Sequence, residues 1–134
     1  MNDPRGPVIL LVDDHLDNRE MYTEYLRTRG YEVIPCANSQ ECLDLAVRHT
    51  PDLILLELRM DGMSGIEVIA HLKAERSLAG VPIVALTASV LPFQRREALA
   101  AGFARVIPKP CLPEDLADEI ARILSSRSNP KPAA

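Results

Sequence analysis

Three acidic residues, a threonine and a lysine stand at or just after short apolar runs, and their side chains could do chemistry together. The runs are VILLV, DLILLE, PIVAL and FARVI, and the residues are Asp13, Asp14, Glu57, Thr87 and Lys109. Clustered carboxylates repel one another unless a cation joins them, and hard oxygen ligands suit Mg²⁺. A lysine ammonium and a threonine hydroxyl beside such an ion could hold the oxygens of a phosphoryl group.

These residues can meet only if the apolar runs are neighbouring strands. The predicted strands are Val8–Val12, Tyr31–Pro35, Asp52–Glu57, Pro82–Leu86 and Phe103–Ile107. Three of them are almost continuously apolar, which is typical of parallel strands covered on both faces. Helical patterns lie between the strands, so the repeating βα unit predicts an α/β fold with a doubly wound parallel sheet. In such folds the functional site lies beyond the carboxyl ends of the strands.

Local signals mark where the predicted helices begin and end. Gly30 and Gly102 follow helical patterns and provide C-terminal stops. Ser64 and Glu67 have the spacing of a capping box, and Pro113 suits a first helical turn. Each candidate site residue could instead be an ordinary cap or turn residue. Their shared position at successive strand ends favours one common site.

Composition narrows the classes of function. The chain has 134 residues with a net charge of −4, so we expect one domain and no nucleic-acid partner. No apolar run reaches the ~18 residues of a membrane span, and the N-terminus lacks a signal peptide's basic start, so we expect a cytoplasmic protein with no membrane partner. We expect a single domain over residues 1–125, a disordered tail over 126–134, and no output domain.

The cysteines and histidines do not indicate a metal site. The three cysteines are widely spaced and include no C-x-x-C pair, and they are Cys36, Cys42 and Cys111. We expect them to act as small apolar side chains that pack in the core, in a protein of a reducing compartment. His15 follows the acidic pair, where it could tune access to the site or simply lie exposed in a loop.

Over roughly residues 7–125 the sequence resembles the receiver domain of two-component response regulators. The resemblance is carried by ILLVDDHLDNR, PDLILLELRMDGMSGIEVI, VPIVALTAS and AGFARVIPKP. It implies the flavodoxin-like (βα)5 fold with strand order 2-1-3-4-5. It also implies a signalling role in a phosphorelay rather than an enzyme, with a sensor histidine kinase or another signalling protein as partner.

The resemblance also implies roles for single residues. Thr87 matches the switch hydroxyl, Lys109 the lysine that contacts the phosphoryl group, and Glu57 stands at the position of the phosphoacceptor aspartate. The expected Mg²⁺ ligands are Asp13, Asp14, Glu57 and the backbone carbonyl of Arg59. The expected partner surface lies on the fourth helix, fifth strand and fifth helix, and its residues are Gln94, Arg95, Arg96 and Arg105. This surface could mediate a homodimer or receive an acidic partner, or it could be only a solvated face.

The sequence departs from the family pattern at three positions. Glu57 replaces the acceptor aspartate, and Asp61 replaces the usual proline in RMDGMSG. Val106 stands at the switch position that usually holds an inward-swinging aromatic, and Phe103 is the only aromatic residue of the predicted strand. Asp61 and Val106 favour a naturally divergent receiver over one engineered at Glu57.

The longer side chain of Glu57 changes the expected chemistry. Its carboxylate lies about one C–C bond, roughly 1.5 Å, further out than that of aspartate. Misplacement by ~1 Å can reduce a rate ~10²-fold, so efficient phosphorylation is not expected. The carboxylate could meet Lys109 and Thr87 directly, which would either mimic the phosphorylated state or lock the site. Pairing with Lys109 would also weaken or abolish Mg²⁺ binding.

Three functions follow from these residues. The leading interpretation is a stand-alone receiver that signals without phosphorylation or mimics the phosphorylated state. An ordinary receiver that is still phosphorylated slowly with Mg²⁺ is the alternative. A metal-dependent phosphohydrolase on a similar fold is a third interpretation, although 134 residues leave little room for a substrate-covering insertion.

Overall fold

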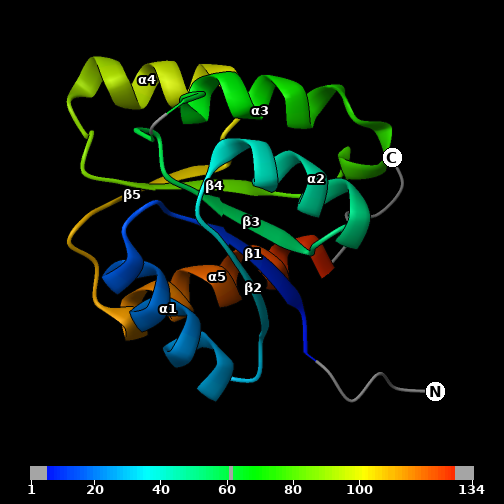
Figure 1. The fold of residues 1–134 in the computed structure, drawn as a ribbon. Coiled ribbons are helices and arrows are strands. Elements are labelled where there is room, and N and C mark those ends of the chain that lie inside the picture. Colours follow the sequence, from blue (N-terminus) through cyan, green and yellow to red (C-terminus); the bar gives the residue numbers. More distant parts are fainter. Residues whose placement is uncertain (1–5, 61, 129–134) are drawn as a thin grey trace.

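The computed structural model describes residues 6–60 and 62–128, and strands and helices alternate along them (Figure 1). The strands are β1 (Val8–Val12), β2 (Glu32–Cys36), β3 (Leu53–Leu56), β4 (Ile83–Thr87) and β5 (Arg105–Pro108). The α-helices are α1 (Leu16–Thr28), α2 (Ser39–His49), α3 (Gly65–Ala74), α4 (Pro92–Ala101) and α5 (Pro113–Ser128). A short 3₁₀ helix, η1 (Arg76–Leu78), precedes β4. Every predicted strand is present, with ends displaced by no more than two residues.

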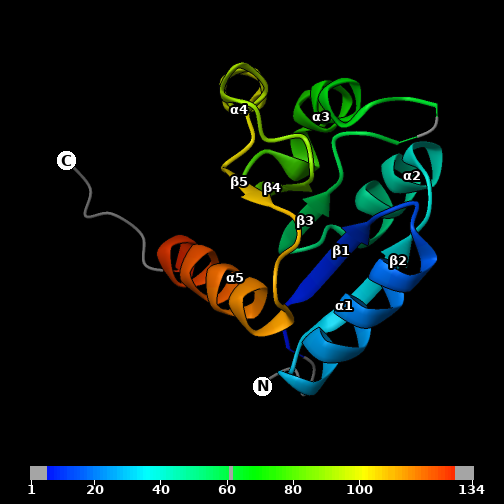
Figure 2. The same cartoon turned by 90° about the vertical axis from the view of Figure 1, so that its left-hand side faces the viewer.

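The five strands form one parallel sheet in the order β2-β1-β3-β4-β5, which confirms the predicted fold. Helices α1 and α5 cover one face of the sheet, and α2, α3 and α4 cover the other (Figure 2). Because all strands run the same way, their carboxyl ends lie along one edge. The loops that follow β1, β3, β4 and β5 therefore meet at that edge.

The core is divided by the sheet into two layers. Side chains alternate between the faces of a strand, so Leu10 and Ile54 enter the layer under α2, α3 and α4, while Ile9 and Leu55 enter the layer under α1 and α5. All four are completely buried. Burial of each such side chain stabilises the fold by about 1.5–3 kcal/mol. The three central strands are therefore rigid supports for the loops at their ends.

The predicted helix signals are borne out by backbone geometry. Ser64 and Glu67 form the capping box of α3. Gly30 and Gly102 have φ angles of +94° and +115°, which residues with a side chain rarely adopt. Helix α5 continues to Ser128, three residues beyond the boundary expected at 125. The rest of the expected tail, 129–134, lies outside the described residues.

Two of the cysteines have the predicted role in the core. Cys36 and Cys42 are buried and free, and burial raises the pKa of their thiols to about 11 and about 12. Cys111 is half-buried in the loop between β5 and α5. Among the described residues, no helix is both long and apolar enough to span a membrane.

Candidate functional site

The backbone places the predicted site residues at the carboxyl edge of the sheet. Asp13 follows β1, and its N–H donates to the Cys36 carbonyl at 3.0 Å. Glu57 follows β3 and donates through its N–H to the Val12 carbonyl at 3.1 Å. The Lys109 N–H donates to the carbonyl of Thr87, the last residue of β4, at 2.9 Å. These bonds extend the strand ladders, so they fix where each side chain begins.

A three-membered ion cluster forms the centre of the site. The Lys109 ammonium donates to Asp13 Oδ2 at 2.8 Å and to Glu57 Oε1 at 2.9 Å. Asp13 is 1% exposed and Glu57 is 5% exposed, so one ammonium neutralises two buried carboxylates only in part. Burial acts to lower the pKa of the Lys109 ammonium, but its hydrogen bonds to Asp13 and Glu57 outweigh burial and raise this pKa above the ordinary lysine value.

Both oxygens of the Glu57 carboxylate have hydrogen-bond donors. Oε1 accepts from Lys109, while Oε2 accepts from the N–H of Leu58 at 2.7 Å and that of Arg59 at 3.3 Å. The side chain therefore bridges Lys109 and its own following backbone. Thr87 is completely buried, and its hydroxyl oxygen accepts from the N–H of Ser89 at 3.0 Å.

The acidic pair lies close to His15, and together they make a candidate cation site. The ligand atoms of Asp13, Asp14 and His15 lie within 4.8 Å of one another. Asp13 Oδ1 accepts from the His15 N–H at 2.9 Å. Asp14 Oδ1 is buried without a hydrogen bond, because His15 Nδ1 at 3.2 Å lies outside hydrogen-bonding geometry. A buried carboxylate oxygen that accepts no hydrogen bond, beside a second carboxylate, fits a hard cation such as Mg²⁺. Glu57 is outside this group, since its oxygens are engaged elsewhere.

A cavity of about 380 Å³ opens over the site from the α4 side. Its lining includes His15, Glu57, Arg59, Thr87 and Ser89. Ser89 is 7% exposed, and its buried hydroxyl has no hydrogen-bond partner within the described part of the chain. The cavity gives small molecules a route to the ion cluster.

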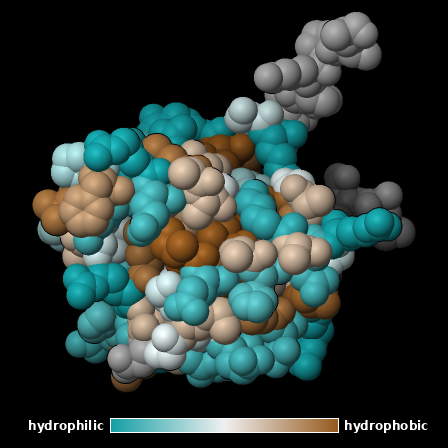
Figure 3. Space-filling model, turned by 90° about the horizontal axis from the view of Figure 1, so that it is seen from above, coloured by the Kyte–Doolittle hydropathy of each residue, from teal (hydrophilic) through white to brown (hydrophobic). Residues whose placement is uncertain are grey.

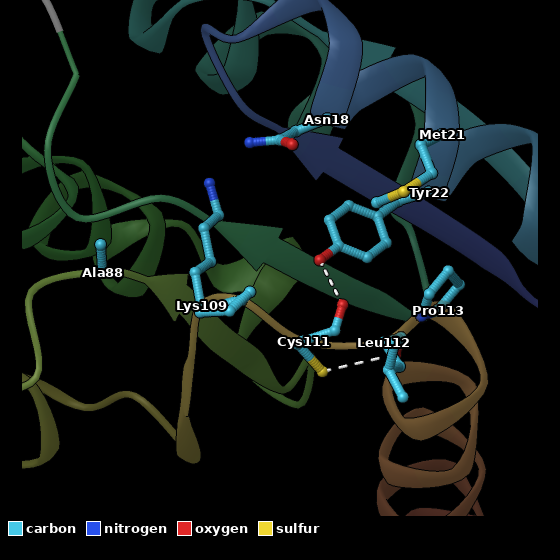
Figure 4. A pocket seen from close by; sticks show the side chains of 9 residues that line it. Asn18, Met21, Tyr22, Ala88, Lys109, Cys111, Leu112 and Pro113 are labelled. Carbon is cyan, nitrogen blue, oxygen red and sulfur yellow. Dashed lines mark hydrogen bonds between the residues drawn. The ribbon is translucent and has the colours of Figure 1, made fainter.

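Two residues that the sequence did not single out hold the site from α1. The Tyr22 hydroxyl donates to the Cys111 carbonyl at 2.6 Å, beside a cavity of about 500 Å³ into which the Lys109 side chain also extends (Figure 4). Arg19 donates to the Asp13 carbonyl at 2.8 Å. The Lys109–Pro110 peptide bond, left open by the sequence, is cis. From the sequence, Tyr22 could be identified only as a residue on the apolar face of α1. Helical spacing does not show which group its hydroxyl contacts.

The position in β5 where we expect the switch residue carries no aromatic side chain. Val106 is buried against the α3 and α4 layer at 3% exposure. Phe103, which we placed in the fifth strand, lies two residues before β5 begins at Arg105, where it is buried in the same layer. Asp61, the third departure from the family pattern, lies outside the described residues.

The expected partner surface is both basic and apolar. Arg95 and Arg96 are exposed on α4, and Gln94 is half-buried. Arg105 is paired with Glu119 of α5 at 2.9 Å, which offsets part of its charge. The apolar part was not predicted from the sequence. Its members are between 43% and 58% exposed, and they are Val90, Leu91, Phe93 and Leu99. Apolar and polar residues are interspersed over the molecular face that carries α3 and α4 (Figure 3).

Comparison with known proteins identifies the family. Residues 9–121 match the response regulator receiver domain. The chain belongs to this family. It is 33% identical over 102 residues to the polar-differentiation response regulator DivK of Brucella anthropi, covering 76% of this chain and 83% of that protein. It is 35% identical over 119 residues, 89% of the chain, to the phosphate regulon transcriptional regulatory protein PhoB of Pseudomonas aeruginosa, and it spans about half of that relative's length, 52%.

Solved structures agree with this assignment. The receiver superimposes on the chemotaxis protein CheY4 of Vibrio cholerae with a TM-score of 0.84 at 30% identity, covering 87% of this chain and 98% of that one. Receiver domains are signalling modules that interact with histidine kinases and other signalling proteins, and they bind Mg²⁺ at their acidic pocket. This receiver has a cluster of Asp13, Asp14 and His15 whose ligand atoms could hold a metal ion.

Proposed function

We propose that this receiver is a protein-binding signalling module whose conformation is set by the Glu57–Lys109 ion pair rather than by phosphoryl transfer to Glu57. The observation that carries the proposal is that Lys109 and two backbone N–H groups engage both carboxylate oxygens. A phosphoacceptor must instead direct an oxygen lone pair at phosphorus, in line with the leaving group.

The hydrogen bonds of the Glu57 carboxylate oppose its phosphorylation. Attack on phosphorus withdraws negative charge from the carboxylate and so weakens its hydrogen bonds to Lys109 and the Leu58 N–H, and each hydrogen bond to a charged group contributes about 1.5–3 kcal/mol. That range corresponds to a rate about 10- to 100-fold lower, since 1.36 kcal/mol is a factor of ten. The bonds from Lys109 and Leu58 are 2.9 and 2.7 Å long, and the carboxylate is buried. Glu57 is therefore a structural partner of Lys109 and a poor nucleophile.

The contacts of Thr87 favour a locked site over mimicry of phosphorylation. A mimic should engage both the lysine and the switch hydroxyl, as a phosphoryl group would. The Thr87 hydroxyl oxygen accepts from Ser89, and Glu57 turns to Lys109 and its own backbone. With Val106 at the switch position, β5 offers no aromatic side chain to move inward. The module would thus present one constant surface to its partners.

Magnesium fits this site only in part. Asp13, Asp14 and the backbone carbonyl of Arg59 would hold the ion, and the lack of a hydrogen bond to the buried Asp14 Oδ1 supports that assignment. Bound Mg²⁺ would offset the charge of the acidic pair. Lys109 already binds Asp13 and Glu57, so it competes with the ion for the same carboxylates. We therefore expect Mg²⁺ to bind more weakly here than to the Glu57→Asp variant.

The intact mass of the protein after incubation with Mg²⁺ and acetyl phosphate tests the proposal. We expect the Glu57→Asp variant to gain one phosphoryl group and the natural chain to gain none over the same time. Gain at a similar rate by the natural chain would overturn the proposal and establish a slow ordinary receiver. Sustained release of phosphate from phosphate esters by the natural chain would instead indicate a phosphohydrolase.

The surface of α4 with β5 and α5 is the proposed partner site. Exposed Arg95 and Arg96 lie between apolar Phe93 and Leu99 along α4, a combination that suits an acidic, partly apolar surface. A histidine kinase or another signalling protein could supply that surface, and so could a second copy of the chain. Sedimentation of the natural chain beside Phe93→Glu distinguishes self-association, because the variant should remain monomeric at concentrations where the natural chain pairs.

A further inference from the structure

A second charged cavity lies at the opposite end of the sheet from the acidic site. Its volume is about 410 Å³, and the turn before β4, the start of β5 and the last turns of α5 surround it. Four cationic side chains line it, and they are Lys73, Arg105, Arg122 and Arg127. We call these four residues and the cavity the basic pocket.

The carboxylates near the basic pocket do not balance its charge. Glu119 accepts from Arg105 at 2.9 Å and from Arg122 at 3.0 Å, so one carboxylate serves two guanidinium groups. Arg127 binds the Asp52 carbonyl at 2.9 Å and lies 3.6 Å from its carboxylate.

The Asp52 carboxylate also accepts from the Val8 N–H at 2.7 Å. Lys73 has no ion pair with another described residue. Four cations thus meet two carboxylates, an excess of two positive charges on a chain whose net charge is −4.

We propose that the basic pocket binds a small molecule bearing phosphate groups. Guanidinium groups donate pairs of parallel hydrogen bonds to phosphate oxygens, and three of the four cations are arginines. The volume lies within the ~300–1,000 Å³ of small-molecule sites. Val81 and Ile123 also line the cavity and offer an apolar wall to the rest of the ligand.

This site is separate from the acidic pocket, and the inference goes beyond the proposed function of Glu57. Pro82 and Ala104 line the basic pocket and precede β4 and β5, whereas Thr87 and Lys109 stand at the far ends of those strands. Five strand residues span roughly 16 Å. Phosphate groups bound at one end therefore cannot contact the ion cluster at the other.

Titration with inorganic pyrophosphate, followed by backbone amide NMR in the presence of a chelator, tests the proposal. We expect saturable shifts centred on Gly80, Ala104 and Arg105. The Lys73→Gln/Arg122→Gln variant should raise the Kd about tenfold or more, because it removes two charge-assisted contacts. Arg95→Gln/Arg96→Gln removes the same charge from α4 and should leave the Kd within about twofold, because exposed charges outside the pocket contribute little.

A pocket-filling variant separates a built site from diffuse attraction. Gly80 has an ordinary φ, and an added Cβ would meet only the Arg127 guanidinium at 4.0 Å. Gly80→Leu should therefore fold, keep every cation and weaken pyrophosphate binding. The proposal would be overturned if the Arg95→Gln/Arg96→Gln control weakened pyrophosphate binding equally, or if Gly80→Leu had no effect on it. Shifts centred on Thr87 and Lys109 would also overturn it.

Discussion

The two ends of the sheet carry opposite charges and use them differently. At the carboxyl end, Lys109 is buried with Asp13 and Glu57, and its side chain is 12% exposed. At the amino end, Arg105 and Arg122 share Glu119, and their side chains are 46% and 66% exposed. Buried charges are tolerated only when they are paired, whereas exposed ones keep their hydration. The buried end is therefore fixed by its ion pairs, and the exposed end keeps cations available for a ligand.

The largest contrast should come from removing one cation at each end. Lys109→Met leaves two buried carboxylates without their ammonium, so we expect a loss of about 3–5 kcal/mol in the free energy of unfolding. Arg105→Gln breaks an exposed pair, and the expected loss is about 0–1 kcal/mol. Urea denaturation of both variants measures the two values. Similar losses would show that burial does not distinguish the two ends.

Glycine substitutions should reveal a similar contrast in packing. A Cβ at Gly65 would lie 2.7 Å from the Glu57 carbonyl oxygen and 2.8 Å from Leu58 Cα, both backbone atoms. Gly65→Ala should reduce the free energy of unfolding by about 1–3 kcal/mol through overpacking. A Cβ at Gly80, at the basic pocket, would meet only the Arg127 guanidinium at 4.0 Å, so Gly80→Ala should change the free energy of unfolding by no more than about 0.5 kcal/mol. Thermal unfolding compares the two, and equal shifts in Tm would contradict the contrast.

Loss of the Tyr22 hydroxyl should have a smaller effect. Tyr22→Phe removes the 2.6 Å hydrogen bond to the Cys111 carbonyl and leaves the ring in place. We expect the free energy of unfolding to fall by about 0.5–1.5 kcal/mol, which is the usual net contribution of such a hydrogen bond. Arg29 also bonds a tyrosine hydroxyl, that of Tyr25, but at an exposed position, so Tyr25→Phe is the matched control. If Tyr25→Phe reduces the free energy of unfolding by as much as Tyr22→Phe, the loop after β5 is not held by Tyr22.

The last expected effect is a decline in stability that begins at alkaline pH. Burial raises the pKa of the Cys42 thiol from 9.0 to about 12, so the unfolded chain loses this proton first as pH rises. The contribution of the protonated Cys42 thiol to the free energy of unfolding is complete below about pH 9, and it is lost as pH approaches 12. The raised pKa of Lys109 acts in the same direction, because its ammonium is favoured in the folded state. Urea midpoints should therefore fall above about pH 9, and less steeply in Cys42→Ala.

The sequence was sufficient for the fold and for the convergence of the candidate site residues at one edge of the sheet. Nearly continuous apolar strands predicted a parallel sheet, and strand-end residues such as Asp13 and Lys109 necessarily converge at its edge. The sequence could not decide what the Glu57 carboxylate would bind, because that choice depends on side-chain positions within an ångström. The basic pocket was also missed, since Lys73, Arg105 and Arg122 come from elements far apart in the chain. The start of β5 was misplaced because Phe103 packs in the core before the strand begins.

A double-mutant cycle between Glu57 and Lys109 tests the central claim most directly. The free energies of unfolding of the natural chain, Glu57→Gln, Lys109→Met and the double variant give the coupling between the two side chains. Because Lys109 and Glu57 form a buried ion pair at 2.9 Å, we predict a coupling of about 1–3 kcal/mol. A coupling within about 0.5 kcal/mol of zero would mean that the two side chains act independently, and it would contradict the proposed lock.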